Sequence, residues 1–547
     1  MMFRRDRPLN GDPLVYVMPG VNALRIHRVP LLGALAVAAL AVAVACGGRA
    51  ANDAPRPTTV DPAVAAATIT AGDMIERIGT LAHDSMRGRD TPSPGLEMAA
   101  AYLASEFRAL GLAPGGDDGF FLQRYPLPLR ALDTTAVHFG SVAGGENRML
   151  AYGVDFFAAA ARPFPDAAMG HGRLVWTGRV EAGALAAGPE VQGQVMVVGV
   201  PGAFSRDFRL AVSSARGAAQ QADARALLVV LDPEFAADAF ARLARASRSP
   251  SRALVDPAEI PVFYVTYGAA SALFGRGGLR PEQLPPAPPS PVVVPGVDTH
   301  FAAPARILED ANPPNVVAIL RGSDPALRDT YVVFSAHMDH IGVGTADATG
   351  DSIHNGADDD ASGTSALVEV AEAFASLSEA PRRSLVFLAV SGEEKGLLGS
   401  RWFTDHPTIP LDRMIANINV DMIGRNAPDS IVAIGQEYSS LGPLLERVAG
   451  EHPELGLTVS RDLWPEERFF FRSDHFNFAR HEIPALFFFA GTHEDYHRPS
   501  DEVEKIDGEK AARVARLVFH VARAIADSGE PPRWTEQGLA EVRALTR

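Results

Sequence analysis

One segment, residues 330–363 (TYVVFSAHMDHIGVGTADATGDSIHNGADDDASG), constrains the fold more than any other. It begins with the apolar, strand-like run 331–334, breaks at His337, and reaches three consecutive acids, 358–360, before helical spacing begins after Gly363. Ligands of open α/β sheets bind where a strand ends and a helix begins. Imidazole and carboxylate groups suit zinc, and three adjacent like charges are costly without a cation. The segment therefore predicts a metal site.

Strand-like and helical segments alternate from residue 296 onwards. We expect strands at 315–320, 331–335, 384–390, 414–420, 431–434 and 485–489, and helices at 362–377, 399–403 and 509–525. Alternation of this kind predicts an α/β fold, with a mixed, mainly parallel sheet and helices on both faces. Continuous apolar runs such as SLVFLAV are typical of buried parallel strands.

Acidic residues and a histidine follow three more of these strands. Glu393 and Glu394 come after SLVFLAVSG, Asp421 after MIANINV, and His497 shortly after PALFFFAG. Any one of them alone would more often be a helix cap or a surface residue than a ligand. Because the carboxyl ends of parallel strands share one rim, the whole set can converge.

The candidate ligands are sufficient for two zinc ions. They are His337, Asp359, Glu394, Asp421 and His497. If one carboxylate bridges, each ion has three protein ligands and one open position for water, which is typical of catalytic zinc. Glu393 is then the candidate base that takes the water proton. Asp339, two residues after the first histidine, is expected to orient that imidazole.

These motifs resemble a known family. The segments SAHMDH, NGADDDASG, AVSGEEKGLLGS, NVDMIG and DYHRPSD are similar, in order, to the co-catalytic zinc aminopeptidases of bacteria, of the leucyl aminopeptidase and aminopeptidase Y type. The resemblance implies the zinc exopeptidase fold and hydrolysis of N-terminal residues from peptides. It extends over most of residues 315–507, and RGRDTPSPG at 87–95 resembles the N-terminal part of the same family.

The resemblance also implies individual roles. It makes Asp359 the bridging ligand, with a cis peptide bond to Asp360, and it makes Glu393 the base. One zinc ion would be held by His337, Asp359 and Asp421, and the other by Asp359, Glu394 and His497. Tyr496 matches a tyrosine that hydrogen-bonds the substrate carbonyl in some relatives, although a phenol beside a ligand could equally be packing.

Several residues near the motifs are expected to have structural roles. We predict a solvated turn for Arg87 and Arg89, and core packing for the phenylalanines at 469–471, with a wall of the substrate pocket as the alternative. The extra imidazoles are expected to be satisfied polar residues: His340, His354, His475 and His493. The segment at His481-Glu482 departs from relatives, which often carry glycine before the isoleucine-proline pair.

The chain is expected to contain several regions. Residues 131–295 combine short β-like runs, a helical stretch at 215–226 and a proline-dense end; this insert resembles a protease-associated domain. Residues 72–130 and 296–530 form the peptidase domain, and 531–547 a C-terminal tail.

The N-terminus predicts export. Residues 1–45 resemble a lipoprotein-type signal peptide, because a basic start and a short apolar run precede Cys46, the single cysteine. Lipid on Cys46 would anchor the exported enzyme to a membrane of the bacterial cell envelope, with 46–71 as a flexible tether; plain secretion and a membrane-spanning anchor are the alternatives. The net charge of −16 argues against nucleic acid as a partner.

The sequence is compatible with three functions. The first is an aminopeptidase acting on peptide substrates. The second is a carboxypeptidase or glutaminyl cyclase of the same superfamily, and the third is a non-enzymatic surface protein that keeps the fold. The intact ligand set and Glu393 favour an enzyme.

Overall fold

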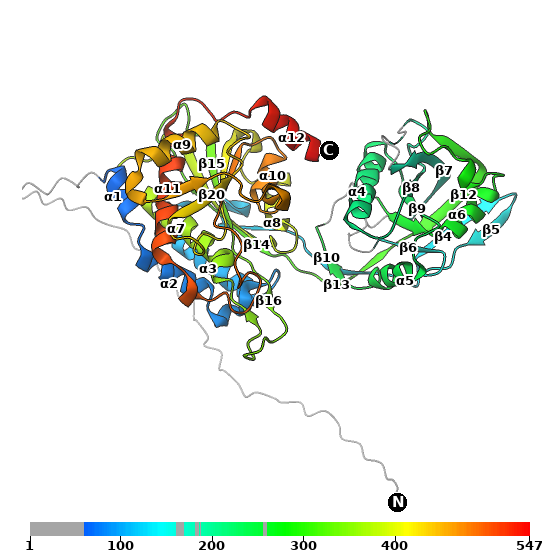
Figure 1. The fold of residues 1–547 in the computed structure, drawn as a ribbon, viewed down its shortest axis with the longest axis horizontal. Coiled ribbons are helices and arrows are strands. Elements are labelled where there is room, and N and C mark those ends of the chain that lie inside the picture. Colours follow the sequence, from blue (N-terminus) through cyan, green and yellow to red (C-terminus); the bar gives the residue numbers. More distant parts are fainter. Residues whose placement is uncertain (1–59, 160–168, 181–184, 186–187, 255–259, 547) are drawn as a thin grey trace, which may run out of the picture. The chain divides into compact units, whose positions relative to one another are not determined.

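The central strands of the larger sheet run parallel, and their order brings the predicted site together. In this computed structural model, which describes residues 60–159, 169–180, 185, 188–254 and 260–546, the order is β1-β14-β18-β15-β19-β22-β20-β21, with β2 paired to β14. Figure 1 labels β14, β15 and β20 of this sheet. The strands are β1 (Ala113–Pro114), β2 (Leu122–Arg124), β14 (Pro314–Leu320), β15 (Tyr331–His337), β18 (Ser384–Val390), β19 (Met414–Val420), β20 (Ser430–Ile434), β21 (Thr458–Ser460) and β22 (Ala485–Phe489). Strands β18, β15, β19 and β22 are parallel neighbours, whereas β14 and β20 join this group antiparallel. The sheet is therefore mixed with a parallel centre, as predicted.

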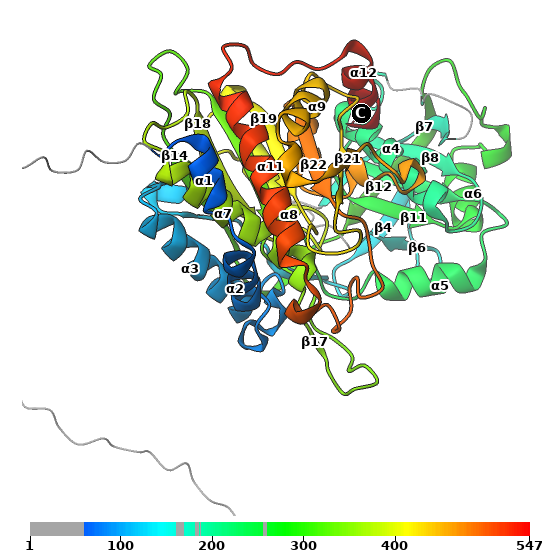
Figure 2. The ribbon, with the colours of Figure 1, turned by 60° about the vertical axis from the view of Figure 1, so that its left-hand side comes forward.

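Helices cover both faces because successive side chains of each strand point to opposite sides. Val332 and Phe334 of β15 belong to the core shared with helices α1, α2, α3, α7, α9 and α11, whereas Val333 belongs to the core shared with α8 and α10. Figure 2 shows α7 and α11 lying along the first face. The helices are α1 (Pro62–Ala67), α2 (Ala71–Leu81), α3 (Pro94–Ala109), α7 (Gly363–Ser376), α8 (Leu398–Asp405), α9 (Leu441–Glu451), α10 (His475–Ala479) and α11 (Gly508–Asp527).

The start of the described chain differs from the expected tether. Residues Pro62–Ala67 form α1, which Asp61 caps by accepting the amide hydrogen of Val64, and Ala65 and Ala66 are buried in the main core. Proline at the first helical position and an aspartate cap are strong helix-start signals. The ordered fold therefore begins about ten residues before the predicted end of the tether.

The expected tail also contains a helix, α12 (Glu536–Thr546). Glu482 has a φ of 62°, in the left-handed region that favours glycine. Its carboxylate accepts two hydrogen bonds from Arg543 on α12, at 2.7 and 2.9 Å, and its carbonyl accepts one from the Trp534 indole at 2.6 Å. These contacts stabilise a backbone conformation that is unfavourable for a non-glycine residue.

The predicted insert contains its own eight-stranded sheet, in the order β5-β4-β12-β7-β8-β9-β11-β6. Its strands are β4 (His138–Ala143), β5 (Glu146–Met149), β6 (Phe156–Ala158), β7 (Met169–Arg179), β8 (Val195–Val200), β9 (Ala226–Leu231), β11 (Val262–Val265) and β12 (Val292–Ala302). Its helices are α4 (Arg206–Gln221), α5 (Ala237–Ala246) and α6 (Tyr267–Gly275). Leu174 and Trp176 face one apolar cluster of this sheet and Val175 faces the other, so the insert has a core on each side.

The predicted boundary at residue 295 falls inside strand β12 and is wrong. The pairing of β12 with β7 shifts register between Val293 and Asp298, and Gly296 in this bulge has a φ of 65°. Proline and glycine are tolerated in strands at bulges, so the Pro295-Gly296 pair interrupts the strand without ending it. The sheet continues to Ala302.

Smaller elements complete the described part. Strands β3 (Leu129–Leu132), β10 (Ser251–Arg252) and β13 (Ala305–Glu309) form a three-stranded sheet, and β16 (Gly342–Val343) pairs with β17 (Ile353–His354). Among the described residues, none of the helices combines the length and apolar character needed to span a membrane. The predicted signal peptide, Cys46 and most of the tether lie outside these residues.

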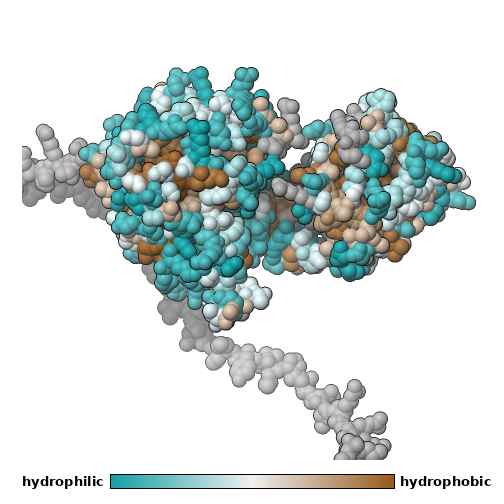
Figure 3. All heavy atoms as spheres, viewed as in Figure 1, coloured by the Kyte–Doolittle hydropathy of each residue, from teal (hydrophilic) through white to brown (hydrophobic). Residues whose placement is uncertain are grey.

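The face drawn in Figure 3 is largely hydrophilic with scattered apolar patches.

Candidate metal centre

Four of the five candidate ligands and Glu393 lie at or beyond the carboxyl ends of parallel strands, whereas Asp359 lies in the segment directly before α7. His337 ends β15, Asp421 follows β19, and Glu393 and Glu394 follow β18 within four residues. His497 lies in the loop after β22. Parallel strands present these ends on one rim, which is where ligands bind in open α/β sheets.

The first group of ligands surrounds the His337 imidazole. Its Nε2 lies 3.2 Å from Asp359 Oδ1 and 3.6 Å from Asp421 Oδ1, and Glu393 Oε2 is at 4.0 Å. Ligand atoms at ~2.1 Å from a tetrahedral zinc ion lie about 3.4 Å from one another. The Asp359 and Asp421 oxygens therefore each lie from His337 Nε2 at about the spacing of ligands around one ion.

The second group surrounds His497. Its Nε2 lies 3.2 Å from Asp359 Oδ2 and 3.2 Å from Glu394 Oε2. Asp359 thus presents Oδ1 to His337 and Oδ2 to His497. A carboxylate with one oxygen toward each of two imidazoles has the geometry of a bridging ligand.

The donor set fits cations. Asp359 Oδ2 and Glu394 Oε1 are buried without a hydrogen-bond partner. Burial lowers the pKa of the His337 imidazole, but the surrounding carboxylates, Asp421 first, raise it well above its usual value. Buried carboxylates this close together need compensating positive charge, and zinc would supply it in place of protons.

The three consecutive acids have three different environments. The Asp358 carboxylate accepts the Gly424 amide hydrogen at 2.6 Å. Both oxygens of Asp360 accept backbone amide hydrogens, Oδ1 from Gly363 and Met422 and Oδ2 from His337. Only Asp359 directs its carboxylate at both imidazoles. The peptide bond between Asp359 and Asp360 is cis, as the resemblance implies.

The Asp501 side chain holds the backbone at Asp358 and Asp359 in place. Its carboxylate accepts the amide hydrogens of Asp358, at 3.0 Å, and Asp359, at 3.1 Å. Just before them, Gly356 has a φ of 58°, and a Cβ there would lie 2.1 Å from the Asp359 carbonyl oxygen. Glycine is therefore required for the tight turn that directs Asp359 into the site.

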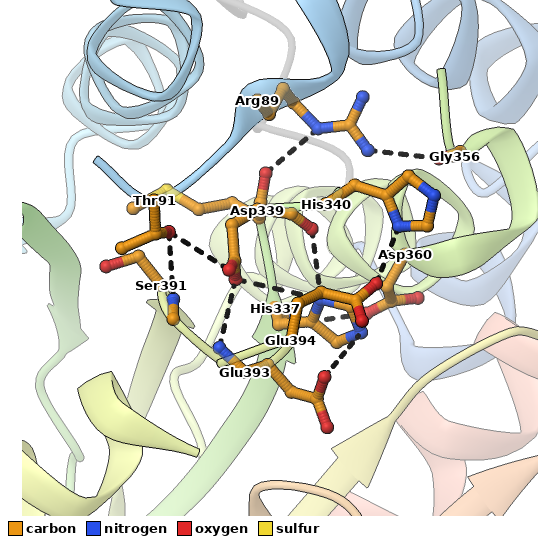
Figure 4. Close-up of polar contacts among 12 residues, drawn as sticks. Arg89, Thr91, His337, Asp339, His340, Gly356, Asp360, Ser391, Glu393 and Glu394 are labelled. Carbon is orange, nitrogen blue, oxygen red and sulfur yellow. Dashed lines mark hydrogen bonds and ion pairs between the residues drawn. The ribbon is translucent and has the colours of Figure 1, made fainter. Parts of the chain in front are cut away.

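Asp339 orients the imidazole through a different atom from the one expected. His337 Nδ1 lies 3.1 Å from the Asp339 carbonyl oxygen but 3.8 Å from its carboxylate. The carboxylate instead accepts the Thr91 hydroxyl at 3.0 Å and the Glu393 amide at 3.3 Å (Figure 4). The main chain therefore leaves Nε2 available to a metal, and the side chain positions the Glu393 loop.

Arg89 is buried rather than solvated. Only 1% of its surface is exposed, and its guanidinium donates to the carbonyl oxygens of Leu81, Met338, Asn355 and Gly356 at 2.6–3.0 Å. Met338 follows a candidate ligand and Gly356 precedes another, so this one side chain connects both segments to the N-terminal helices. Burial is possible because main-chain oxygens, instead of water, solvate the positive charge of the Arg89 guanidinium.

Glu393 lies against the first ligand group with its carboxyl buried. Burial raises the pKa of Glu393 well above its usual range, although His337 opposes the shift. The adjacent Glu394 faces His497 instead, and the pKa of Glu394 is lowered to about 2 because contacts with His340 and His497 outweigh burial.

A pocket opens on the two ligand groups. Its lining residues are His337, Asp359, Glu393, Asp421, Met422, Phe469, Arg472, Ser473, Phe487, Phe489, Tyr496 and His497. Phe469 packs in the core and also lines the pocket, so both roles considered for the phenylalanines hold for this residue. The Tyr496 ring stacks on His497 with centroids 3.8 Å apart, and burial raises the pKa of its phenol, which keeps the proton available for donation.

The four extra imidazoles have unlike surroundings. His475 stacks on Phe487, His493 lies 3.3 Å from Asp358, and His354 is partly exposed. His340, however, lies 2.7 Å from Glu394 Oε1, and neither of its ring nitrogens has a hydrogen-bond partner. The prediction of satisfied polar residues is therefore wrong for His340, and also for His475 and His493, whose ring nitrogens likewise lack hydrogen-bond partners.

Comparisons with known proteins agree with this chemistry. Residues 315–522 match the model of peptidase family M28. A "Probable zinc metalloprotease" of Pyrenophora teres f. teres is 36% identical over 121 residues, which cover 22% of this chain and 25% of that protein. Aminopeptidase YwaD of Bacillus subtilis is 31% identical over 176 residues, which cover 30% and 36%. The chain thus spans only part of the length of the relatives it matches.

Among solved structures, an aminopeptidase from Aneurinibacillus sp. strain AM-1 covers 86% of this chain and 97% of its own. It is 19% identical, with a TM-score of 0.45. Identity and structural similarity this low do not identify a function. The match to the family comes from the sequence of residues 315–522.

Proposed function

We propose that this chain, whose residues 315–522 belong to peptidase family M28, is a two-zinc aminopeptidase that removes N-terminal residues from peptides. The observation that carries the proposal is the placement of Asp359, whose two oxygens each lie 3.2 Å from a different imidazole. Three ligands per ion with one shared carboxylate would leave a coordination position for water.

The residues around the pocket would divide the reaction between them. A pair of zinc ions bound here would lower the pKa of water and polarise the peptide carbonyl. The Glu393 carboxylate, 4.0 Å from His337 Nε2, would take the water proton and return it to the leaving amine. The Tyr496 phenol would donate a hydrogen bond to the carbonyl oxygen. The Asp339 carboxylate would hold Glu393 in place by accepting the hydrogen bond of the Glu393 backbone amide.

Metal content tests the proposal directly. We expect the metal-free protein to take up two zinc ions per chain, and chelators to abolish hydrolysis of an aminoacyl chromogenic substrate until zinc is restored. Saturation at one ion with full activity would contradict the two-zinc mechanism. Two bound ions without turnover of any N-terminal substrate would favour a carboxypeptidase or a non-enzymatic role, and cyclisation of N-terminal glutamine would identify a cyclase.

We further propose that the insert, which extends to Ala302, is a module of the protease-associated type. The support for this is its separate sheet, with an apolar cluster on each face. Its mixture of parallel and antiparallel strands and the proline-dense segment that leads into β12 are in keeping with this proposal.

Location is a separate proposal. The apolar run before Cys46 and the small residues next to it favour lipid attachment, so we expect the mature protein to partition with membranes. Cys46→Ser should leave an unlipidated precursor with altered gel mobility. If that variant keeps the mobility and the membrane association of the wild type, the lipoprotein proposal fails.

A further inference from the structure

His340 lies against the second ligand group, although the proposed set of five ligands does not include it. It is fully buried, and its Nδ1 lies 2.7 Å from Glu394 Oε1 and 3.8 Å from Asp359 Oδ2. Its ring is 5.9 Å from the His497 ring, measured between centroids. Figure 4 shows the imidazole pointing at the acidic side chains rather than away from them.

The atoms that meet at this point are not satisfied by hydrogen bonds. Among the described residues, both ring nitrogens of His340, Asp359 Oδ2 and Glu394 Oε1 are buried without a hydrogen-bond partner. The 2.7 Å approach of His340 to Glu394 is short enough for a hydrogen bond but lacks the direction of one. Buried polar groups are almost always paired, and unpaired ones cost free energy. Atoms that converge without bonding one another are arranged as ligands of a common ion.

Two other imidazoles among the described residues, His475 and His493, also have unpaired ring nitrogens and provide a contrast. His493 faces one carboxylate, that of Asp358 at 3.3 Å, rather than two. His475 is as buried as His340, and its ring nitrogens also lack hydrogen-bond partners. Its ring, however, contacts Phe470 and Phe487 with centroids 4.9 and 4.7 Å away, and it has no ion-pair contact with a described carboxylate. Burial without a partner therefore does not by itself mark a ligand; in His340 it is combined with two carboxylates that face Nδ1.

We propose that His340 is a further zinc ligand, through Nδ1, of the ion held by Asp359, Glu394 and His497. This inference rests on the proposed two-zinc function. It makes the two sites unequal, with four protein ligands at the second site and three at the site of His337 and Asp421. Four protein ligands close a zinc site, whereas three leave a position open. The open position therefore stays beside Glu393, which faces His337.

Stepwise zinc affinity tests this assignment. The metal-free protein is titrated with zinc in competition with a chromogenic chelator, for the wild type, His340→Leu and the matched control His475→Leu. We expect His340→Leu to weaken one of the two binding steps by well over 10²-fold, because losing an orienting contact typically costs only about 10- to 100-fold. The other step and both steps of the control should change little.

A direct measurement keeps the test independent of variant folding. In crystals of the zinc-loaded wild type, anomalous scattering locates each ion, and we expect a zinc–Nδ1 distance of ~2.1 Å for His340. A distance beyond about 3 Å, or unchanged affinities in His340→Leu, would overturn the assignment while leaving the two-zinc function standing. A wild type that binds fewer than two zinc ions would instead overturn the proposed function.

Discussion

Glu393→Gln is expected to lower kcat by about 10²-fold or more while both zinc ions remain bound. Glutamine keeps the length and the hydrogen-bonding capacity of the side chain but cannot accept the water proton. The metal content should not change, because Glu393 Oε2 lies 4.0 Å from His337 Nε2 and outside the ligand spacing of the other carboxylates. The measurements are steady-state kinetics, zinc analysis and the affinity for a non-hydrolysed peptide analogue.

The neighbouring residue supplies the matched control. Glu394 Oε2 lies 3.2 Å from His497 Nε2, so Glu394→Gln should lose zinc from one site together with activity. The two residues lie in the turn after β18, where Glu393 approaches His337 and Glu394 approaches His497, so the pair can divide these two roles. If Glu393→Gln loses zinc and Glu394→Gln retains it, the base and the ligand have been assigned the wrong way round.

The sequence was sufficient to predict the larger sheet because each strand is a continuous apolar run. All six predicted strands of that sheet appear within two residues of their expected bounds, and the parallel centre follows from their alternation with helices. Strand β12 was missed for a local reason. The Pro295-Gly296 pair resembles a chain break, but the partner strand absorbs it as a bulge.

Part of the site could be predicted because its residues follow strands, and strand ends converge by topology alone. Arg89 and His340 carry no such signal. The partners of Arg89 are carbonyl oxygens of distant segments, and any residue type supplies a carbonyl. His340 is three residues past His337, and only the fold of the loop decides whether its ring faces carboxylates or solvent. The RGRD phrase of the resemblance was the one available indication for Arg89.

Asp359→Asn is expected to have the largest effect on metal binding, because among the described residues only this side chain directs its carboxylate at both His337 and His497. Replacing one carboxylate oxygen by an amide nitrogen leaves a group that cannot bridge two cations. We expect both zinc sites to weaken, each by about 10²-fold or more, and hydrolysis at ordinary zinc concentrations to fall on the order of 10³-fold. Zinc titration and steady-state kinetics measure the two effects.

Asp360→Asn is the decisive comparison, since the Asp360 carboxylate also lies within 4.8 Å of ligand atoms of His337 and Asp421. Its oxygens already accept three backbone amide hydrogens, so it has little capacity left for a metal. An asparagine there would turn an amide group toward a backbone N–H, which should cost about 1–3 kcal/mol in the free energy of unfolding while both zinc ions stay bound. Denaturant unfolding of the metal-free proteins isolates that cost. If Asp360→Asn loses a zinc ion and Asp359→Asn keeps both, then Asp360 is the ligand, and the bridge must be sought elsewhere among the carboxylates.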